Sequence, residues 1–229
     1  MTAPQALPRR YAPGLRAAAP FAVAVVLFGM SFGVLAEAAG IGATASIVMS
    51  ATTFAGSAQF AIASILSAGG GIAAAIGAAV LLNARYAPIG LSVAPVVKGG
   101  PLRRFVKSQF VVDESWALSA REEGGYDPRI LFGAGGLLYV SWVAGTTLGV
   151  LVGDVLGDPE ALGLDAAFPA LFLGLLIPML RTRRAVVAAL AGAAIALTLV
   201  PLAPPGLPII AAAAACLIGW RSPPERSAA

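Results

Sequence analysis

The stretch ATASIVMSATTFAGSAQFAIASILSA, residues 43–68, decides the fold. It is long enough to cross a bilayer, because a spanning helix needs about 20 mostly apolar residues, but it is unusually polar for such a helix. Its polar and small residues are Ser46, Ser50, Thr52, Thr53, Gly56, Ser57, Gln59, Ser64 and Ser67. We expect a broken, re-entrant segment, in which two half-helices meet near Gly56 and both outer ends lie on the same side of a membrane.

Six other segments are apolar over a length that crosses a bilayer or nearly does: 17–36, 72–97, 130–152, 165–180, 185–202 and 206–220. Loops rich in Lys and Arg lie on the cytoplasmic side of membrane proteins. If 43–68 re-enters, the basic clusters 9–16, 98–129, 181–184 and 221–226 all lie on that side, and the acidic loop 154–165 lies outside. If 43–68 crosses instead, the basic loop 98–107 lies outside unless 108–120 also enters the membrane. This pattern favours the broken segment.

The composition is typical of a membrane protein. Of 229 residues, 59% are apolar and 11% are charged, whereas a soluble domain is roughly a quarter charged. The sequence therefore predicts an all-α integral membrane protein, a polytopic bundle of about six or seven transmembrane helices. We expect one transmembrane domain at 17–220 between cytoplasmic tails at 1–16 and 221–229, in a bacterial inner membrane.

Several functions are excluded by the residues that the chain lacks. The net charge of +4 is explained by topology signals in the loops, so nucleic acid is not expected as a partner. There is no histidine, and Cys216 is the single cysteine, so neither a disulfide nor a site for a metal cofactor is expected. No other cofactor and no enzymatic activity are expected. Carboxylates remain as the natural proton carriers.

Arg85 lies almost at the centre of the apolar run 72–97. An arginine at mid-bilayer costs at least about 2.5 kcal/mol, so such a charge faces a partner or a wet cavity. The guanidinium fork suits a carboxylate, which makes Arg85 a candidate for binding the carboxylate of an amino or organic acid. The alternative is a fixed ion pair with a carboxylate of the protein.

The residues around Arg85 are also candidates for substrate binding. Asn83, Tyr86 and Gly90 fall at helical spacing and can line one face, although Arg85 points away from Asn83 in a straight helix. Pro88 has no backbone donor, and we expect it to free the carbonyl of the fourth residue before it, Ala84, for another partner.

Two adjacent carboxylates, Asp113 and Glu114, lie in the apolar segment Ser108-Gln-Phe-Val-Val-Asp-Glu-Ser-Trp-Ala-Leu118. Partial burial raises the pKa of a carboxyl group, so either residue is a candidate for proton coupling. Neighbours in a helix diverge by about 100°, so we expect one of the two to face the pathway. The alternative is a surface helix whose acids are solvated.

The stretch 52–60 is the third candidate site. A break near Gly56 exposes backbone groups, which membrane proteins tolerate only where protein or water satisfies them. The N-terminus of a half-helix suits a substrate carboxylate, and the Gln59 amide can both donate and accept. Gly56, Ser57 and Gln59 are therefore candidates for substrate binding. The alternative is that the small residues serve close helix packing.

Two stretches of the chain are alike. Gly29-Met-Ser-Phe-Gly33-Val-Leu35 and Gly145-Thr-Thr-Leu-Gly149-Val-Leu151 share the pattern Gly-x-x-x-Gly-Val-Leu. Each is followed by an acidic residue, Glu37 or Asp154, which we expect at the outer interface. Internal repeats are common in transporters, but Gly-x-x-x-Gly also marks close helix packing, and both interpretations remain open.

Four stretches in this order resemble the AzlC family, the large subunits of branched-chain amino-acid exporters of the LIV-E class. They are Phe28-Gly-Met-Ser-Phe-Gly33, Phe54-Ala-Gly-Ser-Ala-Gln-Phe60, Leu82-Asn-Ala-Arg-Tyr86 and Asp113-Glu-Ser-Trp-Ala-Leu118. The resemblance implies export of valine, leucine and isoleucine, with methionine as a further candidate, driven by the proton-motive force. It also implies a small membrane partner of the AzlD type.

The leading hypothesis is therefore a secondary transporter, with substrate bound by Arg85 and its neighbours and protons carried by Asp113 or Glu114. The first alternative is a channel-like pore, for which 43–68 would be the filter. The second is a non-transporting scaffold or a permease subunit of an ABC-type system, although the chain has no P-loop and the ATPase would be another polypeptide.

Overall fold

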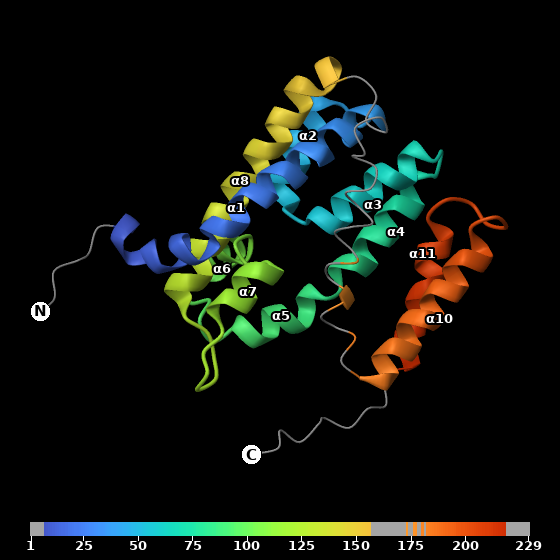
Figure 1. The fold of residues 1–229 in the computed structure, drawn as a ribbon. Helices are drawn as coiled ribbons and strands as arrows, with labels where there is room; N and C mark the ends of the chain where they lie inside the picture. The colour runs from blue at the N-terminus through green and yellow to red at the C-terminus, as the bar shows by residue number, and fades with distance from the viewer. Residues whose placement is uncertain (1–6, 157–172, 174–175, 178–179, 181, 219–229) are drawn as a thin grey trace, which may run out of the picture.

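The computed structural model describes residues 7–156, 173, 176–177, 180 and 182–218, and the regular elements among them are all helices (Figure 1). In chain order they are α1 (Leu7–Ala38), α2 (Ala43–Thr53), α3 (Gly56–Ser67), α4 (Ile72–Asn83), α5 (Tyr86–Val93), α6 (Pro101–Ser108), α7 (Asp113–Ser119), α8 (Pro128–Leu156), α10 (Arg183–Leu199), α11 (Leu207–Ala212) and the 3₁₀ helix η3 (Ala213–Ile218).

Three of the described helical stretches are long and apolar enough to cross a membrane, namely Arg10–Ala38, Ile72–Val93 and Pro128–Gly153. The all-helical membrane architecture predicted from the sequence is thus confirmed. The predicted spans 185–202 and 206–220 form shorter helices, the 17-residue α10 and the pair α11 and η3. The predicted span 165–180 lies almost wholly outside the described residues.

The first helix begins earlier than its apolar run. α1 starts at Leu7, whereas the expected cytoplasmic tail extended to residue 16. Helix formation needs no apolar residues, and the prolines inside α1, Pro13 and Pro20, do not end it.

Segment 43–68 is broken, as predicted. α2 ends at Thr53, α3 begins at Gly56, and Phe54 between them has a φ angle of 41°. In Figure 1, α2 runs back from the C-terminal end of α1 to the middle of the molecule, and α3 leaves the middle alongside α4. The chain therefore turns back at the break, and re-entry of this pair from one side of a membrane stays a prediction.

The long helices α1 and α8 lie side by side and run in the same direction (Figure 1). Their glycines face one another in order along the interface, Gly14 with Gly133, Gly29 with Gly145 and Gly33 with Gly149. A Cβ atom added at Gly149 would lie 2.1 Å from the carbonyl oxygen of Met30. The two similar Gly-x-x-x-Gly stretches thus pack closely against each other, which glycine permits because it has no side chain.

The acidic residues that follow these stretches lie at matching places. Glu37 is in the last turn of α1 and Asp154 is in the last turn of α8, at the ends that the parallel helices share. Their predicted place at the outer interface stays a prediction.

Candidate functional site

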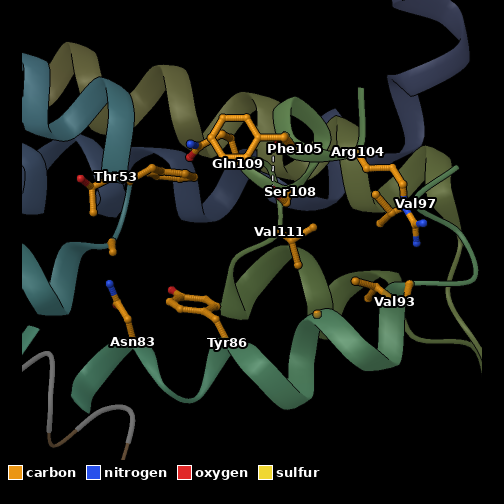
Figure 2. Close-up of a pocket in the computed structure, with 14 residues that line it drawn as sticks. Thr53, Asn83, Tyr86, Val93, Val97, Arg104, Phe105, Ser108, Gln109 and Val111 are labelled. Carbon is orange, nitrogen blue, oxygen red and sulfur yellow. Dashed lines mark hydrogen bonds between the residues drawn. The ribbon is translucent and has the colours of Figure 1, made fainter. Parts of the chain in front are cut away.

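The site lies where two helix breaks meet. The first break, at Phe54 and Ala55, separates α2 from α3, and the second separates α4, which ends at Asn83, from α5, which begins at Tyr86. Residues of both breaks line a cavity of about 490 Å³. In Figure 2, Thr53 and Asn83 lie toward one end of this cavity and Arg104 and Val97 toward the other.

The shared helix face predicted for Asn83, Tyr86 and Gly90 is confirmed, because all three residues line this cavity. The expectation for Pro88 is wrong. The carbonyl oxygen of Ala84 is not freed, because it accepts a hydrogen bond of 3.1 Å from the backbone N–H of Ala87. The chain forms a 3₁₀-type turn here, in which the carbonyl oxygen accepts a hydrogen bond from the N–H three residues later.

Side chains from distant elements satisfy the backbone groups at the first break. The last carbonyls of a helix and its first N–H groups have no partner within the helix. The hydroxyl of Tyr139 donates to the carbonyl oxygen of Ala51, and the amide of Gln109 donates to that of Thr52, each at 2.8 Å. On the other side of the break, the N–H of Ala55 donates to the side-chain oxygen of Gln59 at 3.2 Å.

Gln59 is fully buried and its amide is engaged at both ends. Its oxygen also accepts from the indole N–H of Trp142 at 3.0 Å, and its nitrogen donates to the hydroxyl of Ser50 at 2.8 Å. The Ser50 hydroxyl is 2.8 Å from that of Thr146. This network ties α2, α3 and α8 together. Gln59 lines neither cavity of the site, so the geometry gives it a positioning role, and substrate binding by Gln59 stays a prediction.

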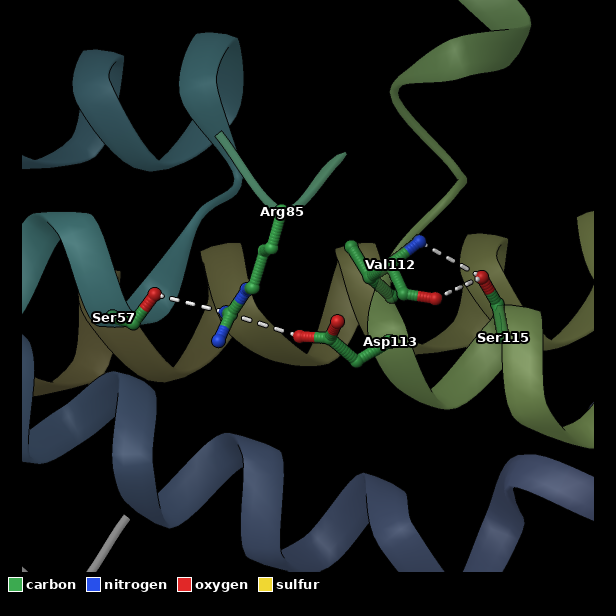
Figure 3. Close-up of polar contacts among 5 residues, drawn as sticks. All are labelled: Ser57, Arg85, Val112, Asp113 and Ser115. Atoms are coloured by element: carbon green, nitrogen blue, oxygen red, sulfur yellow. Dashed lines mark hydrogen bonds and ion pairs between the residues drawn. The ribbon is translucent and has the colours of Figure 1, made fainter. Parts of the chain in front are cut away.

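Arg85 lies between α4 and α5 and bonds to two other elements (Figure 3). Its Nη2 atom is 3.0 Å from the Oδ2 atom of Asp113 and donates to the hydroxyl of Ser57 at 2.9 Å. The guanidinium also lies over the Tyr86 ring, 5.3 Å from its centroid. The ion pair that the sequence left as an alternative is therefore present. Both partners keep about a third of their side chains exposed, 31% for Arg85 and 27% for Asp113.

Two polar atoms at the breaks are buried and have no hydrogen-bond partner among the described residues. They are the Nε atom of Arg85, a donor, and the Oδ1 atom of Asn83, an acceptor. A buried polar group without a partner costs about 1–3 kcal/mol. Each such atom is therefore a place where a polar ligand would gain a hydrogen bond.

A second, smaller cavity of about 70 Å³ surrounds the ion pair. Its polar lining consists of the predicted site residues Gly56, Ser57, Arg85, Tyr86, Asp113 and Glu114, and its apolar lining includes Val25, Phe28, Leu138 and Trp142. Both acids line this cavity, whereas the sequence led us to expect only one of them. Phe54 and Tyr86 line the smaller and the larger cavity alike, so these two rings separate them.

The acidic pair opens α7, which lies outside the three long apolar helices. The hydroxyl of Ser115 accepts from the N–H of Val112 at 2.9 Å and so fixes the start of the helix (Figure 3). Burial raises the pKa of the Glu114 carboxyl, and it also raises that of Asp113 although the charge of Arg85 opposes this shift. The alternative of solvated surface acids is therefore not supported.

Sequence reasoning missed some residues of the site. Phe54 carries the positive φ angle of the first break, a conformation that glycine normally supplies. Trp142 and Thr146 lie far from the break in sequence, and no local pattern links them to it. In the sequence, Ser50 is only one of several polar residues in 43–68.

Comparisons with known proteins identify a family and several relatives of this chain. A family model described as "AzlC protein" matches residues 20–156, which include both breaks and the acidic pair. A protein of Archaeoglobus fulgidus, described as "Uncharacterized membrane protein", is 33% identical over 90% of this chain and 93% of its own length. A Helicobacter pylori protein with the same description is 28% identical over 65% of this chain and 66% of its own length. No solved structure matches.

We predict that Gln59→Leu destabilises the folded protein by about 1–3 kcal/mol, because the N–H of Ala55 and the indole of Trp142 lose a buried acceptor. Ser64→Ala, an exposed change on the same helix, should leave stability unchanged within about 0.5 kcal/mol. Unfolding of the purified variants in detergent, followed by tryptophan fluorescence, measures the difference. Equal stability of the two variants would show that the network does not hold the break.

Proposed function

The chain belongs to the AzlC family, a transporter-type family of membrane proteins, and from this premise we propose that it is a secondary transporter that exports branched-chain amino acids. One observation carries the proposal, namely that the Arg85–Asp113 ion pair lies where two helix breaks meet beside a cavity. Secondary transporters bind their substrates at discontinuous helices of this kind.

The lining of the smaller cavity suits the groups of an aliphatic amino acid. Its volume of about 70 Å³ is too small for the whole molecule, so substrate entry must move Phe54 and Tyr86 and join the smaller cavity to the larger one. The unpartnered Nε atom of Arg85 offers a hydrogen bond to the substrate carboxylate. The carboxylate of Glu114 lines the same cavity and offers a site for the substrate ammonium group. Val25, Phe28 and Leu138 provide apolar contacts for a branched side chain. Valine, leucine and isoleucine combine these three features, and methionine is a further candidate.

In the proposed proton coupling, Asp113 and Glu114 have different roles. Asp113 is paired with Arg85 and keeps the guanidinium oriented. Glu114 can hold either a proton or the substrate ammonium group, but not both. Release of the proton from Glu114 therefore accompanies binding of the substrate, and the reverse. A ligand shifts the equilibrium between inward and outward states only if it binds the two states with different affinity. An inward proton gradient then drives the amino acid outward.

We place the protein in the inner membrane of a bacterial cell, with both termini in the cytoplasm, and give it a small membrane partner of the AzlD type. The family membership and the basic loops support these assignments. Transport assays should therefore use the chain in liposomes both alone and together with that small subunit.

We predict that Arg85→Lys lowers leucine flux by at least about tenfold, because an ammonium group cannot reproduce the guanidinium geometry that contacts Ser57, Asp113 and the substrate. Arg103→Lys, an exposed change on α6, keeps the wild-type rate. Labelled leucine flux in proteoliposomes containing equal amounts of inserted protein measures both variants. Wild-type flux from Arg85→Lys would remove this arginine from the substrate site.

We predict that Glu114→Gln uncouples transport from protons. Burial raises the pKa of Glu114, so in the wild type the group takes up its proton closer to neutral pH than an exposed glutamate does. In the variant, exchange of labelled for unlabelled leucine continues, while the acceleration of export by a pH gradient disappears. Glu122→Gln, in an exposed turn, keeps that acceleration.

A full response of Glu114→Gln to the pH gradient would contradict the coupling role. The same assay separates the classes of function. Flux of the wild type without saturation or trans-acceleration would indicate a channel, and export that needs ATP in place of a gradient would indicate an ABC-type permease subunit.

A further inference from the structure

A third cavity, of about 640 Å³, shares no lining residue with the two cavities of the site and lies at the opposite end of α1 and α8 from Glu37 and Asp154. It is formed by the first turns of α1 and α8, the chain after α5, and α6. Among the described residues, its charged lining consists of Arg10, Lys98, Lys107, Arg121, Arg129 and one acid, Asp127. We call this the basic cavity. Neither the substrate site nor the proton pathway uses it.

The single acid of the basic cavity already has hydrogen-bond partners within the protein. Asp127 accepts a hydrogen bond from Arg121 at 2.8 Å, which lowers the pKa of the carboxyl and keeps it charged, and it accepts another from the backbone N–H of Arg129. Lys107 donates to the carbonyl oxygen of Lys98 and lies over the Phe132 ring, which holds its ammonium group at the cavity. The lining therefore carries an excess of positive charge, which suits an anion.

The basic cavity also lies at a membrane boundary. The three apolar stretches that can cross a bilayer begin or end beside it, at Arg10, Val93 and Pro128. The helix α6 next to it has basic residues together with exposed apolar side chains, Leu102 at 76% exposure and Val106 at 51%. Helices of this composition lie in the interface of a membrane with their apolar side chains among the lipid tails.

We propose that the basic cavity binds the phosphate headgroup of an anionic phospholipid, whose acyl chains lie against the apolar side chains of α6. Basic pockets between transmembrane helices bind such headgroups. The exposed Leu102 and Val106 select a lipid over free phosphate, because they offer contacts that only acyl chains can fill. The bound lipid connects α1, α6 and α8 at one face of the protein.

Native mass spectrometry of the purified chain in neutral detergent tests this proposal. Dioleoyl phosphatidylglycerol, dioleoyl phosphatidylcholine and inorganic phosphate are titrated separately, and the dissociation constant of the first bound molecule is measured. We expect phosphatidylglycerol to bind more tightly than phosphatidylcholine. Lys98→Gln and Arg129→Gln should each weaken its binding by about five-fold, the effect of one cation near an anionic lipid surface.

The matched control is Arg183→Gln, an exposed cation outside the basic cavity, which should leave the dissociation constant unchanged. Leu102→Ser should weaken binding of phosphatidylglycerol as well, since it removes an acyl contact. Equal binding of the two lipids, or equal losses in Arg183→Gln and the cavity variants, would overturn the proposal. Inorganic phosphate that binds as tightly as phosphatidylglycerol would overturn the lipid as ligand.

Discussion

Backbone groups at a break in a membrane helix must find partners in the protein or in water, because the lipid tails offer none. The rest of this structure depends on how that requirement is met between α2 and α3. Tyr139 and Gln109 donate to the last carbonyls of α2, and Gln59 accepts from the N–H of Ala55. Tyr139 lies on α8, and Gln59 also accepts a hydrogen bond from Trp142 of α8. The position of α8 therefore decides whether the break is stable.

The position of α8 is set in turn by glycine. The close, parallel contact with α1 at Gly29 and Gly33 brings Trp142 and Thr146 within reach of Gln59 and Ser50. With the first break fixed, the start of α3 presents Ser57 to Arg85, and α7 presents Asp113 from the other side. Arg85, which at mid-membrane would alone cost at least about 2.5 kcal/mol, is thereby held at a cavity with one donor, Nε, still unpartnered.

Much of this arrangement could be predicted from the sequence. The remainder could not, for physical reasons. The clustering of Ser, Thr and Gly in 43–68 predicted a break, but the positive φ angle falls on Phe54, where packing and not residue preference decides the conformation. Arg85 and Asp113 were each identified, but their pairing depends on the path of the chain over 28 residues. The buried role of Gln59 could not be predicted, since an amide suits a ligand and a backbone group equally well. The predicted span 165–180 lies almost wholly outside the described residues.

The central claim, that an aliphatic amino acid binds in the smaller cavity beside Arg85, is tested most directly by substrate protection of a cysteine. The single native cysteine is exposed and is replaced by Cys216→Ser. Val25→Cys then places a thiol in the cavity lining, and Ser67→Cys places one at the exposed end of α3 as a control. We expect leucine to slow maleimide labelling of Val25→Cys, and lysine and glutamate to have no effect, with the control unchanged throughout. Labelling of Val25→Cys at the same rate with and without saturating leucine would contradict the account.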